Sequence, residues 1–570
     1  MSHPVIEFKD FSFRYKSQNE ETLKHINLTI NQGEKVLILG PSGSGKSTLG
    51  NCINGLIPFS YEGEITGSLK VAGIETKEAD IFTLSNHVGT VQQDTDAQFI
   101  GLSVGEDIAF ALENDAMDRP TMLIKVLEAA KTVGMEDFLQ EVPYDLSGGQ
   151  KQKVALAGVI HDEEEILLFD EPLAALDPAM GMTAVDLIDQ IYRNKHKTVI
   201  IIEHRLEDVL YRHVDRILLV HEGQIALDCT PDELLSRNVL KEMGIREPLY
   251  ISALKHAGIR FDKSEHLCDV QALNMDLYRE KLVQHFEENK ASLKAPSVSS
   301  EKLLEVKDVS FSYGSFEALK HVSFDVYKGE RISIVGKNGA GKSTMAKLLC
   351  GIIRPKSGEI LFRGTNCLQY TIRDLGKLIG YVMQNPNQML VKDIIKDEVE
   401  LAMVLNQYPQ EELQKNSEEV LRMCDLYGMR NWPTSVLSYG QRKRVTIASI
   451  LSLRPEIIIV DEPTAGQDYE HYTEIMRFLE DLNTNYGITI LFITHDMHLA
   501  IEYTDRAIVF ADGEKIGDDY VFKILSDDSI IQRANLKQTS LVHLAKAAGL
   551  DPEQFIHAFI DEERRERENG

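Results

Sequence analysis

Short apolar runs mark the predicted buried strands of this chain. The run within Glu34–Leu39 leads directly into a glycine-rich loop, and the residues from Thr48 onward have the pattern of a helix. Two further runs, Ile166–Phe169 and Ile457–Val460, have the length of a buried strand, and each is followed by two adjacent acids. No apolar run approaches the roughly 18–20 residues that span a bilayer, so the pattern predicts no membrane span.

The same pattern occurs twice, which predicts a duplicated domain. The first glycine-rich loop contains Lys46, and the second contains Lys342, 296 residues later. Four further pairs are each separated by 291 residues: Gln93 and Gln384, Ser147 and Ser438, Glu171 and Glu462, and His204 and His495. The change in offset lies between the lysine and glutamine positions, where the first copy has a longer loop near residues 58–67.

The repeat and its surroundings predict four segments. These are a first domain with a helical tail (1–260), a linker (261–302), a second domain with a helical tail (303–550) and a charged tail (551–570). The helical tails are indicated by Leu254–Ile259, which aligns with Ala545–Leu550 at the same offset. The linker contains a mixed-charge helical stretch, Asp276–Lys290, followed by a segment with Ser and Pro. We interpret Asp561–Glu568 as a solvated helix end without a function.

Composition narrows the class of protein. The 570 residues are too many for one ordinary core, and 43% hydrophobic with 26% charged residues excludes a mostly disordered chain. A net charge of −28 disfavours broad nucleic-acid binding, which needs a basic face. Six cysteines without a Cys-x-x-Cys pair indicate reduced core thiols, and Met1–Asp10 lacks the pattern of a secretory signal. We therefore expect a cytosolic protein.

The two glycine-rich loops predict phosphate binding. Each has the form Gly-x-x-x-x-Gly-Lys-Ser between a strand and a helix. Glycines let successive N–H groups point at phosphates, and the helix N-terminus adds a positive dipole end. We expect the lysines to reach the β- and γ-phosphates and the serines to ligate Mg²⁺. The candidate ATP-binding residues here are Gly40, Ser42, Gly43, Gly45, Lys46, Ser47 and Thr48, repeated as Gly336, Asn338, Gly339, Gly341, Lys342, Ser343 and Thr344.

Adjacent acids end the two later apolar runs, as Asp170-Glu171 and Asp461-Glu462. A buried strand does not normally end in two acids without a cation or ligand nearby; an acidic strand-to-loop turn is the alternative. We expect Asp170 and Asp461 to hold Mg²⁺ through water. Glu171 and Glu462 are the candidates that polarise the attacking water.

A serine-glycine segment, Leu146–Gln150, precedes a helical run over Lys151–Ile160 and is repeated at Leu437–Gln441. At this point the chain resembles the ABC-type ATPases over most of both halves. The resemblance implies an α/β fold with two tandem ABC-type P-loop ATPase domains, each with a helical signature subdomain and a short C-terminal helical tail. In that family the signature binds the γ-phosphate of nucleotide held by the other domain. The matching positions are Ser147, Gly149, Ser438 and Gly440.

Further positions match the family one by one. Gln93 and Gln384 resemble the Q-loop glutamine, which senses Mg²⁺ and water, and His204 and His495 resemble the switch histidine at the γ-phosphate. Two more pairs follow: Tyr15 and Tyr313 resemble the aromatic residue that stacks on adenine, with an edge-strand aromatic as the alternative, and Asp177 and Asp468 resemble the D-loop aspartate that links the two sites.

The resemblance implies two composite ATP sites between the halves. The first phosphate loop would face Ser438 and Gly440, and the second would face Ser147 and Gly149. In the second signature Tyr439 replaces a glycine, which we expect to put a bulky side chain beside a phosphate and to weaken that site. Both sites keep their glutamate and histidine, so we predict that both hydrolyse ATP, at unequal rates.

More specific segments resemble the ATPases of energy-coupling-factor (ECF) importers. These are Gln384-Asn385-Pro386-Asn387-Gln388, Glu203-His204-Arg205-Leu206-Glu207 and the aromatic in the second signature. The resemblance implies an ATP-hydrolysing subunit, peripheral on the cytoplasmic face of a prokaryotic membrane. It would dock on an integral T component that holds a substrate-binding S component for a vitamin or other micronutrient. Residues 94–112 and 385–405, around Phe99 and Leu390, would line the docking grooves.

Two alternatives remain open. One is the ATPase of a conventional ABC importer with a periplasmic receptor. The other is a soluble tandem ABC translation factor, which the net charge of −28 and the short, non-basic linker disfavour. The sequence does not identify the transported substrate, because specificity would reside in the S component.

Overall fold

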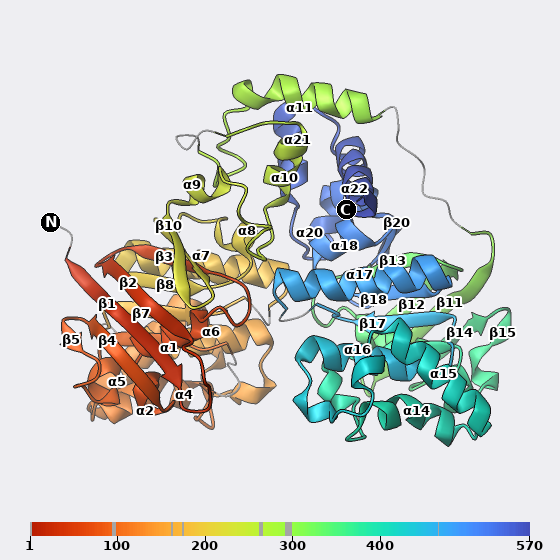
Figure 1. Cartoon of the computed structure of the whole chain (residues 1–570), viewed down its shortest axis with the longest axis horizontal. Coiled ribbons are helices and arrows are strands. Elements are labelled where there is room, and N and C mark those ends of the chain that lie inside the picture. The colour runs from red at the N-terminus through yellow and green to blue at the C-terminus, as the bar shows by residue number, and fades with distance from the viewer. Residues whose placement is uncertain are drawn as a thin grey trace. The chain divides into compact units, whose positions relative to one another are not determined.

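A computed structural model describes residues 3–93, 98–160, 164–173, 176–195, 197–261, 266–290, 299–464 and 467–569. The chain divides into two compact units. The first comprises Met1–Tyr278 with Asp468–Glu470, and the second comprises Arg279–Gln467 with His471–Gly570. Each unit is described by itself below, with the labels of Figure 1.

The first unit contains two sheets (Figure 1). An antiparallel sheet has the order β2-β1-β4-β5, and a six-stranded sheet has the order β10-β9-β3-β8-β7-β6, parallel except for the β9–β10 pair. The strands are β1 (Pro4–Tyr15), β2 (Leu23–Asn31), β3 (Lys35–Leu39), β4 (Gly63–Val71), β5 (Ile74–Glu75), β6 (Val88–Val91), β7 (Ile166–Asp170), β8 (Thr198–Ile202), β9 (Arg216–His221) and β10 (Gln224–Cys229).

In the first unit, α1 follows the phosphate loop, and α4, α5 and α6 form a separate helical part. The helices of this unit are α1 (Lys46–Ile53), α2 (Leu56–Phe59), α3 (Ile81–Ser85), α4 (Val104–Asn114), α5 (Arg119–Val133), α6 (Gly148–Val159), α7 (Pro178–Lys195), α8 (Leu206–Val209), α9 (Pro231–Leu235) and α10 (Leu249–His256). Helices α4, α5 and α6 pack on one another, which confirms a helical signature subdomain.

The second unit repeats this architecture. Its sheets have the orders β12-β11-β14-β15 and β16-β17-β18-β13-β19-β20. The strands are β11 (Lys302–Tyr313), β12 (Phe316–Tyr327), β13 (Arg331–Val335), β14 (Ser357–Phe362), β15 (Thr365–Asn366), β16 (Ile379–Val382), β17 (Ile457–Asp461), β18 (Thr489–Ile493), β19 (Arg506–Ala511) and β20 (Glu514–Tyr520). The matching strand orders confirm the duplicated α/β fold.

The helices of the second unit also match, and further helices follow them. They are α12 (Lys342–Leu349), α13 (Ile372–Leu375), α14 (Ile395–Leu405), α15 (Gln410–Met423), α16 (Tyr439–Leu451), α17 (Tyr469–Tyr486), α18 (Met497–Tyr503), α19 (Val521–Ser526), α20 (Asp528–Arg533), α21 (Ser540–Ala548) and α22 (Pro552–Asn569). Helix α11 (Met275–Lys290) covers the whole of the predicted mixed-charge stretch. Residues 291–298 of the predicted segment with Ser and Pro (291–300) lie outside the described residues.

The core of each unit lies between its sheets and the helix after the phosphate loop. In the first unit, Phe8 and Phe13 of β1, Ile38 of β3 and Leu49 of α1 belong to one buried cluster. Burial on both faces explains why β3, β7 and β8 are continuous apolar runs instead of alternating ones. The runs expected at Glu34–Leu39, Ile166–Phe169 and Ile457–Val460 are confirmed as the central strands β3, β7 and β17.

The C-terminal helix corrects one prediction. We expected Asp561–Glu568 to be a solvated helix end, but α22 packs within the second unit. Phe555 and Phe559 are buried, His557 stacks on Phe522 with ring centroids 4.2 Å apart, and Arg564 forms an ion pair with Asp505 at 2.8 Å. The prediction considered only the charged residues and missed the apolar face that lies one turn earlier in the same helix. Among the helices of the described residues, none has both the length and the apolar character that crossing a bilayer requires.

Candidate functional site

Both phosphate loops lie between a central strand and a helix, as predicted. Gly45 and Gly341 precede α1 and α12 with φ near 104°, a conformation that favours glycine. A Cβ at Gly40 would lie 2.2 Å from the carbonyl oxygen of Val220, and one at Gly336 would lie 2.2 Å from that of Phe510. Glycine is therefore required where each loop passes the neighbouring strand.

The two loop lysines are buried and hydrogen-bonded to their own loops. Lys46 Nζ donates to the carbonyls of Gly40 and Pro41 at 2.8 Å each. Lys342 Nζ donates to Gly336 at 2.6 Å and to Lys337 at 3.0 Å. Burial lowers the pKa of Lys46, although nearby carboxylates act against this shift. Each ammonium group thus lies within the curve of its loop.

The loop serines face the first acid of each strand end. Ser47 Oγ lies 3.3 Å from Asp170 Oδ1, and Ser343 Oγ lies 3.4 Å from Asp461 Oδ2. Burial is the main cause that raises the pKa of both aspartates. A hydroxyl and a carboxylate are hard oxygen donors of the kind that Mg²⁺ prefers, so these residues fit that ion.

The two glutamates have the same backbone geometry. Glu171 has φ 48° and Glu462 has φ 42°, and each N–H donates at 2.8 Å to a carbonyl of the adjacent strand, that of Ile202 or Ile493. Burial raises the pKa of Glu171 to about 7, and the nearby carboxylates of Glu203 and Asp170 add to the rise.

The glutamine and histidine of each half approach these glutamates differently. In the first half Gln93 Nε2 donates to Glu171 Oε2 at 2.6 Å, while His204 Nδ1 lies 4.0 Å from Glu171 Oε1. Burial lowers the pKa of His204.

In the second half His495 Nδ1 lies 2.6 Å from Glu462 Oε1. The side chain of Gln384 makes no comparable hydrogen bond within the part of the chain that the structure describes. The structure thus brings the loop lysine, serine, aspartate, glutamate and histidine together in each half.

Two further polar side chains at these sites were given no role by the sequence. Glu203 is fully buried and accepts hydrogen bonds from the N–H groups of Leu173 (3.0 Å), His204 (2.9 Å) and Arg205 (3.2 Å). Tyr381 OH donates to Asp461 Oδ2 at 2.6 Å. A comparison of the two copies at the offset of 291 would have marked both positions as differences between the halves. The residue opposite Glu203 is Thr494, and the residue opposite Tyr381 is Thr90.

The two tyrosines expected at adenine lie at the ends of β1 and β11. Tyr15 OH lies 3.1 Å from Thr48 Oγ1, and its ring meets those of Phe13 and Tyr61 edge-on. Tyr313 is exposed and its ring lies 4.8 Å from that of Phe311. Tyr15 therefore lies beside its phosphate loop.

The signature serines cap their helices. Ser147 and Ser438 precede α6 and α16 in capping boxes with Gln150 and Gln441. A Cβ at Gly149 would lie 2.6 Å from the sulfur of Met180, whereas one at Gly440 would meet nothing closer than 3.9 Å.

The tyrosine of the second signature makes a contact that the sequence did not predict. The hydroxyl of Tyr439 donates at 2.9 Å to the backbone carbonyl of Gln384 in the same half. Its expected place beside a phosphate stays a prediction.

Parts of the predicted machinery lie outside the described residues, namely Asp94–Ala97 after the first Q-loop glutamine, and Ala175 and Gly466 before the D-loop aspartates. Asp177 is buried and accepts a hydrogen bond from the N–H of Met180 at 2.9 Å. Phe99, expected in a docking groove, is 7% exposed and packs edge-on against Tyr144, while Leu102 nearby is 84% exposed.

Comparisons with known proteins identify the family. The family described as "ABC transporter" matches residues 23–174 and 319–465, and a second, described as "ATP-binding cassette cobalt transporter", matches residues 237–311. Proteins named as ABC transporter ATP-binding proteins are 52% identical in Enterococcus faecalis and 53% identical in Clostridium perfringens. The first alignment covers 100% of both chains, and the second covers 99% of both.

A solved structure of cbiO1 from Clostridium perfringens, described as part of the ABC transporter complex cbiONQ, is 32% identical. That alignment covers 43% of this chain and 100% of that chain, with a TM-score of 0.39. The two matched ATPase regions, the matched region between them and the full-length relatives show that this chain belongs to the ABC transporter ATP-binding proteins, as a fused tandem subunit of the energy-coupling-factor type that couples ATP hydrolysis to transport.

Proposed function

We propose that this chain energises an ECF-type importer by hydrolysing ATP at two Mg²⁺-dependent sites. The observation that carries the proposal is the meeting of five functional groups in each half: ammonium, hydroxyl, aspartate, glutamate and imidazole. Lys46 and Lys342 neutralise phosphate charge, and Glu171 and Glu462 orient the attacking water. The Ser–Asp pairs would hold Mg²⁺, which supplies charge neutralisation at the β- and γ-phosphates.

We further propose that each ATP is shared between the halves. Ser438 and Gly440 would complete the Lys46 site, and Ser147 and Gly149 would complete the Lys342 site. The capping geometry supports this role, because it places a serine hydroxyl at a helix N-terminus, where the O–H, the backbone N–H groups and the positive end of the helix dipole attract an anion. Gln93 and Gln384 would add the ligands that sense Mg²⁺ and water.

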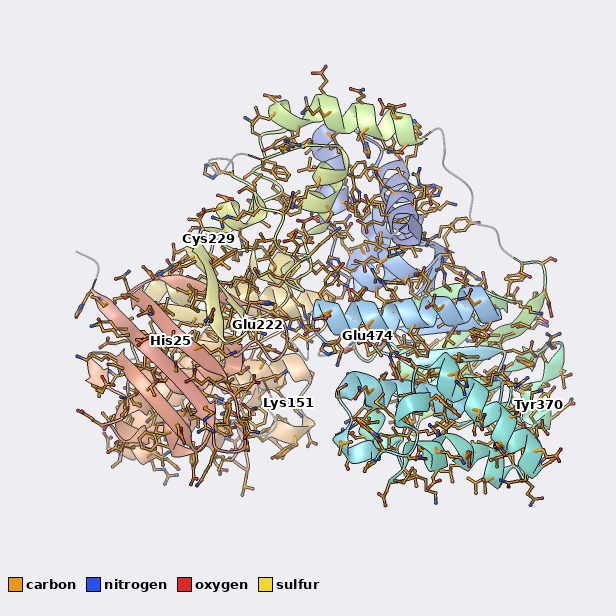
Figure 2. The ribbon with its side chains drawn as sticks, in the orientation of Figure 1. His25, Lys151, Glu222, Cys229, Tyr370 and Glu474 are labelled. Atoms are coloured by element: carbon orange, nitrogen blue, oxygen red, sulfur yellow. The ribbon has the colours of Figure 1, made fainter. Side chains whose placement is uncertain are left out.

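Exposed apolar residues support docking on an integral membrane partner, the T component. In the second half Ile372 of α13 is 62% exposed and Leu405 at the end of α14 is 66% exposed. Arg373 of α13 links this helix to α14 by donating a hydrogen bond to the carbonyl of Leu405 at 2.8 Å. A pocket of about 320 Å³ beside α13 is lined by Tyr370, labelled in Figure 2, and by Leu368 and Ile372. In the first half, Ile100 and Leu102 in the predicted docking segment are exposed.

The cargo would be a micronutrient selected by an S component held on the T component. The "ATP-binding cassette cobalt transporter" match over residues 237–311 favours a transition-metal cation, or a vitamin that contains one, within that class. The subunit would then be peripheral on the cytoplasmic face of the membrane.

Co-purification from membranes, combined with uptake assays, tests the proposal. We expect the full chain to co-purify with small integral membrane proteins and not with ribosomes. Leu102→Asp and Ile372→Asp should abolish ATP-dependent uptake while leaving ATP binding by the isolated chain unchanged. Glu317→Asp, on strand β12, is a matched surface control that should retain uptake. Co-sedimentation with ribosomes, dependence on a periplasmic receptor, or uptake that survives the aspartate substitutions would each contradict the proposal.

A further inference from the structure

The signature helix of the second half is hydrogen-bonded to the Q-loop of the same half through several side chains. Tyr439 OH donates to the carbonyl of Gln384 at 2.9 Å. Lys443 Nζ donates to the same carbonyl and to that of Met383, both at 2.9 Å. Arg442 Nη1 donates to Asn387 Oδ1 at 2.9 Å. The N-terminal end of α16 and the segment 383–387 are therefore linked by three neighbouring side chains.

Breaking this linkage is costly because one of its donors, the ammonium group of Lys443, is buried. Lys443 is 1% exposed, and burial lowers its pKa to about 8. If α16 moved away from the Q-loop, this ammonium group would lose its acceptors inside the protein, which is costly for a buried charged donor. Displacement of the signature therefore displaces the backbone of Gln384 as well.

The first half has different side chains at the equivalent positions. Gly148 replaces Tyr439, and Gln152 replaces Lys443 and donates to the carbonyl of Pro172. Lys151, labelled in Figure 2, replaces Arg442 and lies over the ring of Tyr144, 5.9 Å from its centroid. A glycine cannot form the tyrosine bond, so the linkage belongs to the second half.

We propose that Tyr439, supported by Lys443, is a positioning residue that transmits the state of one ATP site to the other. The inference rests on the proposed sharing of each ATP between halves. In that arrangement Ser438 and Gly440, on either side of Tyr439, contact the nucleotide of the Lys46 site, whereas Gln384 serves the Lys342 site. Nucleotide at the first site thus sets the Q-loop of the second, and the reverse direction lacks an equivalent bond at Gly148.

The experiment measures hydrolysis at one site while occupancy of the other is varied. In the full chain with Glu171→Gln, only the Lys342 site hydrolyses, and the Lys46 site still binds ATP. Adding Lys46→Ala removes that binding. The ratio of single-turnover rates with and without Lys46→Ala is the stimulation of the second site by the first. We expect a ratio above one in the parent and a reduction of about three- to tenfold by Tyr439→Phe, since one hydrogen bond is lost.

Matched variants separate positioning from folding. Tyr427 lies in the same helical subdomain, with its ring against Arg422 (3.7 Å) and Arg430 (4.3 Å), so Tyr427→Phe keeps those contacts and should leave the ratio unchanged. Lys443→Met should lower the ratio as Tyr439→Phe does. A parent ratio of one, or a ratio that Tyr439→Phe leaves unchanged, overturns the inference.

A separate variant tests the arrangement on which the inference rests. With Glu462→Gln, only the Lys46 site hydrolyses, and Ser438→Ala should slow it. If Ser438→Ala has no effect there, the sharing of ATP between halves is wrong. If Ser438→Ala slows that site but Tyr439→Phe leaves the stimulation ratio intact, the sharing stands and the transmission by Tyr439 is wrong.

Discussion

In the first half the amide of Gln93 donates to Glu171 at 2.6 Å, whereas in the second half the imidazole of His495 lies 2.6 Å from Glu462. The catalytic residues are the same in both halves. Their neighbours differ: the first half has buried Glu203, whose carboxylate accepts the N–H of His204, and the second has Thr494, whose hydroxyl lies 3.3 Å from Glu462. Residue identity therefore fixes which groups meet, but the adjacent residues decide which of them are hydrogen-bonded.

The largest effect should come from removing each glutamate separately. Glu171→Gln and Glu462→Gln each delete a group that polarises water, so hydrolysis at the affected site should fall about 10²–10⁴-fold. Because the two surroundings differ, the residual single-turnover rates of the two variants should be unequal. The double variant gives the background. Equal residual rates would contradict the predicted asymmetry.

A smaller effect should follow from the buried ion pair at the start of the first central strand. Lys35 Nζ lies 3.0 Å from Asp189 Oδ1, and both side chains are buried. Lys35→Met leaves Arg193, at 2.8 Å, as the remaining ion-pair partner of Asp189 among the described residues, and should lower the free energy of unfolding of the first unit by about 3 kcal/mol. Urea unfolding followed by circular dichroism measures this change.

The equivalent position offers a matched control. Arg331 pairs with Glu480 at 2.7 Å and with Asp505 at 3.3 Å, so Arg331→Met should destabilise the second unit. The single tryptophan, Trp432, lies in the second half and reports on that unit alone by its fluorescence. Lys35→Met should leave the fluorescence transition in place, and Arg331→Met should shift it. A fluorescence shift in both variants would show that the halves unfold together.

The smallest effect concerns the extra tyrosine at the second site. Tyr381→Phe removes the 2.6 Å hydrogen bond to Asp461, and loss of a group that orients a metal ligand typically weakens metal binding. We expect the Mg²⁺ concentration for half-maximal hydrolysis at the Lys342 site to rise about tenfold. Thr90→Val at the equivalent position should not change it at the Lys46 site. An unchanged Mg²⁺ requirement in Tyr381→Phe would exclude a positioning role for this hydroxyl.

Sequence reasoning was most successful where a pattern is local or repeated. The apolar runs predicted the central strands β3, β7 and β17, and the constant offset between copies predicted the duplicated fold. Glycine spacing predicted the phosphate loops, because only glycine fits where Gly40 passes the carbonyl of Val220.

It was least successful where side-chain direction decides the outcome. The position of Tyr439 in the signature did not indicate that, at the first helical position, its hydroxyl reaches the carbonyl of Gln384. The charged end of α22 likewise hid the apolar residues that hold it in place. Such contacts depend on which distant segment lies opposite, and no local pattern contains that information.

The left-handed backbone at Glu171 and Glu462 has a consequence for the durability of the enzyme. A side chain in that conformation costs about 1 kcal/mol relative to glycine, so the carboxylate is kept at the expense of resistance to heat. Exchanging either glutamate for glycine should produce an inert protein that melts at a higher temperature than the working one. Selection for catalytic turnover, and not for thermal stability, then accounts for an acid at both positions.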